Sequence, residues 1–178
     1  MKRALDILAR SIEAVIEPVG KLGALVLPVL ILTVALNVTL RYGFRMGVIE
    51  LEELQWHLNA IVVMLCMAYA LKHDAHVRVD IFSHHMSSRA RALVDLLGVL
   101  FLLLPFCIGI IWYGWQSFTF SWRIGEGSPM PSGLPMRYLV RLLMVVGFAL
   151  LAAQAVALAA RCLSTLIDPR DSTKKGDA

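Results

Sequence analysis

The sequence has few charged residues, and its longest apolar stretches have none. Asp, Glu, Lys and Arg make up 17% of the 178 residues, against 58% hydrophobic residues. A helix needs roughly 20 mainly apolar residues to cross a membrane. Too little sequence remains between the apolar stretches for a sizeable soluble domain. The stretches without a formal charge are Leu22–Leu40, Leu54–Leu71, Leu96–Trp122 and Leu142–Ala160.

Acidic and basic side chains are therefore missing from the middle of every apolar stretch. A proton-coupled four-helix exporter is expected to keep such a side chain deep in the membrane. An enzyme needs a set such as Ser, His and Asp around a water-filled cavity, and no such set is visible. No internal repeat is visible either, although many secondary transporters consist of repeated halves. We therefore do not expect an enzyme, or a chain that transports a substrate alone.

Metal and haem ligands are also scarce. The 3 cysteines are scattered and form no CxxC pair, so they are expected to be buried apolar residues. His73 and His76 have the spacing of one helical turn, but a basic loop explains them more simply than a metal site. A haem anchor needs facing axial ligands, and only His57 lies inside a predicted helix, near one end. We expect no cofactor in this chain.

The four stretches predict an all-α membrane protein with four transmembrane helices, because each must satisfy its backbone hydrogen bonds internally. The third stretch is longer than the membrane requires, so it must tilt, bend at Pro105 or extend beyond the membrane. We place a single membrane domain at residues 1–165 and a polar cytoplasmic tail at residues 166–178. The helices are placed at about residues 19–41, 53–72, 91–122 and 137–161.

Basic residues are unevenly distributed along the chain. Most of the 17 Lys and Arg residues lie before the first helix, between the second and third, or after the fourth. Cytoplasmic loops carry an excess of Lys and Arg, so both termini are expected in the cytoplasm. The net charge of +4 follows from this bias, and we do not expect nucleic-acid binding. The basic residues on the other side are Arg41, Arg45, Arg123, Arg137 and Arg141.

Residues 2–17 have an amphipathic pattern. Leu5, Leu8 and Ile12 lie on one helical face, and Asp6 and Arg10 lie elsewhere. This spacing predicts an N-terminal amphipathic helix at the inner membrane interface. The alternative is a cytoplasmic extension of the first transmembrane helix.

Polar residues at helical spacing form a stripe on each of the first two helices. Because polar groups that face lipid are costly, both stripes are expected to face protein, either each other or another subunit. We favour internal pairing, since Arg41 supplies a charge opposite to Glu52 at the same depth. Removing one partner of a buried pair costs several kcal/mol. The stripes are Thr33, Asn37 and Arg41 in the first helix and Glu52, Gln55 and Asn59 in the second.

The stretch "ELEELQWHLNAIVVMLCMAYALKHDAHVRVDIF" resembles the signature of the small membrane subunit of tripartite ATP-independent periplasmic (TRAP) transporters, the DctQ-type small permease. The similar features are the acidic residues just before Leu54, Gln55 and Trp56, and the segment from His76 to Asp80 that follows the apolar stretch. The stretch "GEGSPMPSGLPMRYLVRLLMVVGFALLAAQ" is also similar to this family. The resemblance covers roughly residues 15 to 165.

This resemblance implies one part of a three-part transporter in the bacterial inner membrane. A periplasmic protein binds an organic acid, and a large membrane subunit carries the substrate and sodium sites and moves as an elevator. The chain is then expected to pack about one-to-one on the static scaffold of the large subunit, among membrane lipids, and to bind neither sodium nor substrate. The alternative is a stand-alone four-helix membrane protein, such as a haem-carrying anchor.

Two more groups of residues become candidates under this resemblance. Arg78 and Asp80, in the cytoplasmic loop after the second helix, are expected either to clamp that loop or to cap a helix. The loop at 123–137 faces the side of the binding protein, and its alternative role is a purely structural turn. The candidates for docking are Glu50, Glu53, Arg123, Glu126 and Arg137.

Overall fold

The computed structural model describes residues 2–73 and 88–167, and no strand occurs within these ranges. Four helical spans are long and apolar enough to cross a membrane. The predicted all-α class with four such helices is therefore confirmed. The elements are α1 (Lys2–Gly43), α2 (Ile49–Lys72), α4 (Ser88–Gly98), η1 (Val99–Leu103), α5 (Leu104–Ile124) and α6 (Tyr138–Ile167), of which α4, η1 and α5 form one continuous span.

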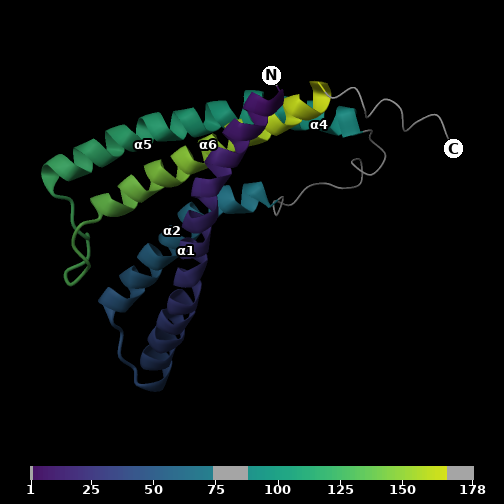
Figure 1. Ribbon diagram of the computed structural model, residues 1–178. Helices are drawn as coiled ribbons and strands as arrows, with labels where there is room; N and C mark the ends of the chain where they lie inside the picture. Colours follow the sequence, from purple (N-terminus) through teal and green to yellow (C-terminus); the bar gives the residue numbers. More distant parts are fainter. Residues whose placement is uncertain (1, 74–87, 168–178) are drawn as a thin grey trace.

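The helices form two antiparallel pairs, α1 with α2 and α5 with α6 (Figure 1). The connections 44–48 and 125–137 lie at one end, which we call the loop end. The first residues of α1 and the last residues of α6 lie at the opposite end, which we call the terminal end. Figure 1 shows that the two pairs diverge towards the loop end.

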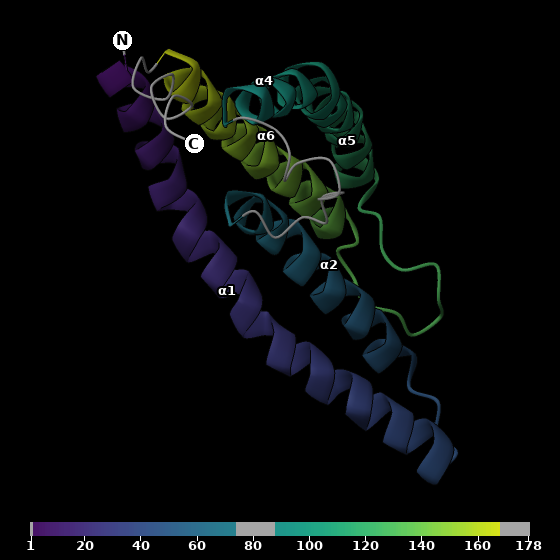
Figure 2. The same ribbon diagram turned by 90° about the vertical axis from the view of Figure 1, so that its right-hand side faces the viewer.

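α6 is the central helix of the fold and packs against α1, α2, α4 and α5 (Figure 2). Its buried residues include Gly147, Ala155 and Ala157. Small residues allow helices to approach closely, which is a main source of helix association in membranes. The outer faces of α1 and α5 carry many exposed apolar side chains, as expected for helices that contact lipid or another subunit.

α1 is one unbroken helix, whereas the sequence suggests separate segments at 2–17 and 19–41. At 1.5 Å per residue it is about 63 Å long, roughly twice the thickness of the hydrocarbon core. Its first part is buried along a narrow edge at Ala9, Glu13 and Ile16, so this part packs against protein on one side. A position of residues 2–17 at the membrane interface stays a prediction.

The third span changes its helical geometry near the middle. Val99–Leu103 forms a π-helical turn, and Pro105 follows it at the start of α5. Proline has no backbone N–H, and its ring clashes with the carbonyl four residues earlier, so a wider turn relieves the conflict. The path bends between α4 and α5 (Figure 2), which is one of the outcomes expected for this long span.

Candidate functional site

Residues of the two predicted polar stripes meet near the loop end. The Arg41 guanidinium donates a hydrogen bond to Glu52, with 2.8 Å between Nη2 and Oε2. Deeper in the helices, Gln55 Nε2 donates to the backbone oxygen of Thr33 over 3.4 Å. The Arg41 and Glu52 side chains are 47% and 45% exposed, so this is not the buried pair suggested by the sequence. A surface pair of this kind contributes between about 0 and 1 kcal/mol.

The two asparagines of the stripes have opposite environments. Asn37 is buried, and its Oδ1 has no hydrogen-bond partner among the described residues. Asn59 is exposed and lies outside the contact between α1 and α2. An exposed amide within an apolar helix is costly against lipid.

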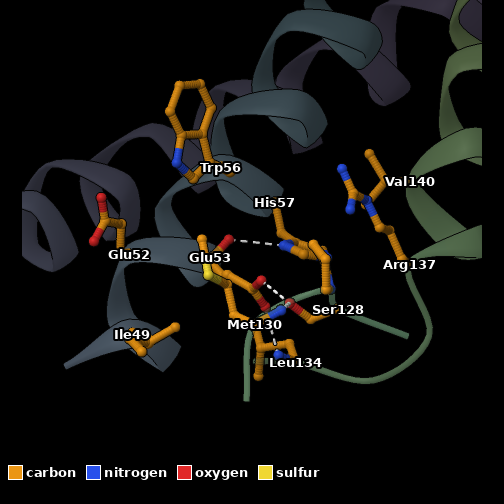
Figure 3. Close-up of a pocket in the computed structure, with 11 residues that line it drawn as sticks. Ile49, Glu52, Glu53, Trp56, His57, Ser128, Met130, Leu134, Arg137 and Val140 are labelled. Carbon is orange, nitrogen blue, oxygen red and sulfur yellow. Dashed lines mark hydrogen bonds between the residues drawn. The ribbon is translucent and has the colours of Figure 1, made fainter. Parts of the chain in front are cut away.

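A cavity of about 390 Å³ lies at the loop end, between the start of α2, the loop 125–137 and the start of α6 (Figure 3). The Glu53 carboxylate on its wall binds the loop. Ser128 Oγ donates to Glu53 Oε1, and the Leu134 N–H donates to Oε2 over 2.5 Å. His57, one turn further along α2, has its Nδ1 2.7 Å from the Glu53 carbonyl oxygen. Glu53 therefore ties the loop to α2.

A second carboxylate fixes the start of the same loop. Gly125 ends α5 with a φ of 61°, the left-handed conformation that glycine adopts readily. This turn brings Glu126 back to α5, where the Ser121 hydroxyl donates to Oε2 over 2.6 Å, and Arg141 of α6 donates to Oε1 over 2.8 Å. These contacts hold the pKa of Glu126 below its ordinary value, and the hydrogen bond from Ser121 contributes most to this shift. The loop is therefore joined to α2, α5 and α6.

The predicted docking residues separate into two groups. Glu53 and Glu126 are bonded within the chain, as expected for a structural turn. Glu50, Arg123 and Arg137 are exposed around the loop. Of these three, only Arg137 lines the cavity in the described part of the chain (Figure 3).

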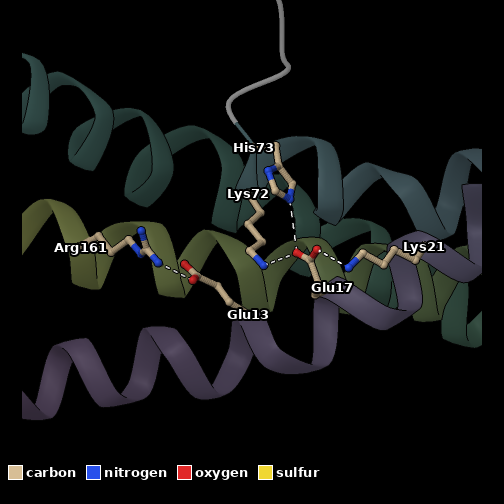
Figure 4. A network of polar contacts seen from close by, with 6 residues as sticks. All are labelled: Glu13, Glu17, Lys21, Lys72, His73 and Arg161. Carbon is tan, nitrogen blue, oxygen red and sulfur yellow. Dashed lines mark hydrogen bonds and ion pairs between the residues drawn. The ribbon is translucent and has the colours of Figure 1, made fainter.

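A polar cluster at the terminal end was missed by the reasoning from sequence (Figure 4). Glu13 of α1 forms an ion pair with Arg161 of α6. One turn further along α1, Glu17 pairs with Lys72 at the end of α2 and with Lys21, the latter at 3.0 Å. The cluster joins three helices. The signal for it was the i, i+4 spacing of the two glutamates just before the first apolar stretch.

Other candidates do not form a site. Arg78 and Asp80 lie outside the described residues, so their expected clamp stays a prediction. Within residues 2–73 and 88–167, no group of three His, Cys, Asp or Glu residues is arranged to hold a metal ion. Cys107 and Cys162 are buried thiols, and Cys66 is partly buried, with its Sγ 3.6 Å from the Gly20 carbonyl oxygen.

A sequence model of one transporter family matches residues 30–165. Its description is "Tripartite ATP-independent periplasmic transporters, DctQ component". No curated protein and no solved structure matches the chain. The matched range contains all of α2, α5 and the loop-end cavity, and nearly all of α6.

Proposed function

The chain belongs to the DctQ family of TRAP transporter components, and from this premise we propose that it braces the large membrane subunit of such a transporter. The large subunit carries the substrate and sodium sites and moves, and this chain enlarges its static part in a one-to-one complex. A periplasmic binding protein delivers an organic acid to the pair. The family match over residues 30–165 is the observation that carries this proposal.

The proposed orientation puts both termini in the cytoplasm of a bacterium and the loop end on the periplasmic side of its inner membrane. The distribution of Lys and Arg along the sequence supports this, because most of them lie before the first apolar stretch, between the second and third, or after the fourth. The loop 125–137, with Glu50, Arg123 and Arg137 exposed around it, then faces the binding protein. Docking there rests on Glu50 and Arg123, since Glu53 and Glu126 are bonded internally and Arg137 lines the loop-end cavity.

The face of α2 that carries Asn59 is the part of the surface that we assign to the large subunit. Val63 is exposed on the same side of α2, one turn after Asn59. An amide at this depth gains a hydrogen bond from a protein partner but not from lipid chains. A bracing role needs such a face, because the chain itself covers only one side of α2.

The alternative of a haem-carrying anchor has less support. His57 lies near the start of α2, where its Nδ1 contacts the Glu53 carbonyl oxygen, and His73 follows the other end of the helix. These two histidines are therefore at opposite ends of the span and cannot serve as axial ligands at one depth. Family membership favours the scaffold.

Site-specific photocrosslinking tests the assigned face. A photoreactive amino acid at position 59, in the chain expressed with its native operon, is expected to give an adduct with the large subunit. The matched control is position 68 of the same helix, because Ala68 is buried within the chain. If position 59 yields only lipid adducts while the complex stays assembled, the face is assigned wrongly.

A further inference from the structure

The loop-end cavity lies at a defined depth. Its α2 wall, which includes Glu53 and Trp56, spans the start of the apolar stretch at Leu54. On the side of α6, Arg137 just before the helix and Val140 within it lie just before the stretch that begins at Leu142. The cavity is therefore at the boundary between hydrocarbon and headgroups, where phospholipid headgroups lie and a soluble protein does not readily reach.

The charges around the cavity are not equally satisfied. Glu53 accepts hydrogen bonds from Ser128 and Leu134, and one oxygen of Glu52 accepts from Arg41. The Arg137 guanidinium, by contrast, has no hydrogen bond or ion pair to any described residue. The Arg137 charge still interacts at longer range with Glu53 and Glu126. The cavity thus presents guanidinium donors that are not hydrogen-bonded, beside two carboxylates that still have acceptor capacity.

Apart from His57, the rest of the wall is apolar and open. Trp56 is 70% exposed and Met130 54%. The other apolar lining residues are Ile49, Pro129, Leu134 and Val140. Figure 3 shows Arg137 and Glu52 on opposite sides of Glu53, with Trp56 above. An exposed tryptophan at this depth is typical of the aromatic belt of membrane proteins.

We propose that this cavity binds a phospholipid with a primary-amine headgroup, such as phosphatidylethanolamine. The Arg137 guanidinium binds the phosphate, which it can do through two parallel hydrogen bonds. The ammonium group lies against the carboxylates of Glu52 and Glu53, and the glycerol and upper acyl chain lie on Trp56 and Val140. The inference goes beyond the proposed function and requires only that the chain spans a membrane.

The headgroup chemistry makes the site selective. Phosphatidylcholine has the same phosphate, but its quaternary ammonium has no N–H to donate to a carboxylate. Phosphatidylglycerol has the phosphate and hydroxyl donors, but it has no cationic group that can pair with the carboxylates of Glu52 and Glu53. The cavity therefore prefers the ethanolamine headgroup over both.

Native mass spectrometry of the complex, purified with its large subunit and stripped of lipid, tests the proposal. The three phospholipids are added with identical acyl chains, and retained adducts are counted. Phosphatidylethanolamine is expected to be retained several-fold more than phosphatidylcholine. Arg137→Gln should lower its retention roughly tenfold, the loss expected for one charge-assisted contact. Arg123→Gln is the matched control, because Arg123 is exposed at the same end and does not line the cavity.

A second pair of variants examines the apolar wall. Trp56→Ala should lower retention, and Trp112→Ala, an equally exposed tryptophan on α5, should not. Equal retention of phosphatidylethanolamine and phosphatidylcholine would overturn the proposal. So would identical behaviour of Arg137→Gln and Arg123→Gln. If Arg137→Gln loses the large subunit or the binding protein while lipid retention is unchanged, a protein occupies the cavity instead.

Discussion

Gly147 of α6 lies directly against Met64 of α2. A Cβ atom placed on Gly147 would be 2.7 Å from Met64 Cβ and 2.9 Å from its carbonyl oxygen. Because one of these neighbours is backbone, a side-chain rotation cannot remove the conflict. The position of the central helix against α2 therefore depends on the absence of a side chain at 147.

Gly147→Ala is expected to destabilise the folded chain by roughly 1–3 kcal/mol, since α2 and α6 must move apart to admit a methyl group. Unfolding in detergent micelles, followed by circular dichroism, measures the change. Gly109→Ala is the control, because nothing lies within 4 Å of a Cβ atom at Gly109 of α5. Equal stability of the two variants would contradict this packing.

Replacement of Glu53 by alanine should release the loop 125–137 from α2. The variant removes both acceptors, and the backbone N–H of Leu134 then loses its partner. Hydrogen exchange of the Leu134 amide is expected to become at least roughly tenfold faster, since opening no longer breaks a charge-assisted hydrogen bond. Glu50→Ala is the control on the same turn of α2, because Glu50 is exposed. Unchanged exchange in Glu53→Ala would show that the loop is held by other contacts.

The pKa of Glu126 predicts how the loop end responds to acid. The Ser121 hydroxyl and Arg141 lower this pKa below its ordinary value of 4.5. These contacts therefore stabilise the folded chain fully at a pH well above 4.5. That contribution is lost as the pH falls from 4.5 towards the folded pKa. Glu126→Gln should therefore lose less thermal stability than the parent chain between neutral pH and about pH 4. The same loss in both chains would exclude Glu126 as the group responsible.

The ion pair between Arg41 and Glu52 is expected to contribute little by itself. Both side chains are nearly half exposed, so Glu52→Gln should cost less than about 1 kcal/mol, and added salt should reduce even this difference. A double-mutant cycle with Arg41→Gln measures the coupling in detergent. A coupling of several kcal/mol would contradict the exposed geometry of this pair.

The sequence predicts the transmembrane spans well. An uncharged stretch long enough to cross the membrane must satisfy its backbone hydrogen bonds internally, which a helix does. It predicts helix ends less well, as Lys2–Gly43 shows. Residues 2–17 are more polar than the apolar stretch that follows, so the sequence suggests a separate segment. In the structure the helix is continuous, because its first residues also pack against other helices. For example, Glu13 forms an ion pair with Arg161, which is 148 positions away in the sequence and could not be identified from helical spacing.

Side-chain partners were harder to predict than helices. Thr33, Gln55, Arg41 and Glu52 meet because their stripes face each other, which helical spacing alone suggests. Asn59 is one turn beyond Gln55, yet it is exposed, since only a narrow edge of α2 faces α1. The loop contacts of Glu53 depend on the path of the glycine- and proline-rich segment 125–137, which has no periodic pattern to read.

Affinity purification of the tagged chain, expressed from its native operon and extracted in mild detergent, tests the central claim most directly. If the chain braces the large subunit, a large polytopic membrane protein is expected to elute with it in about equal amount. A folded chain that elutes alone, with the large subunit present in the same membranes, would contradict a bracing role in a TRAP transporter.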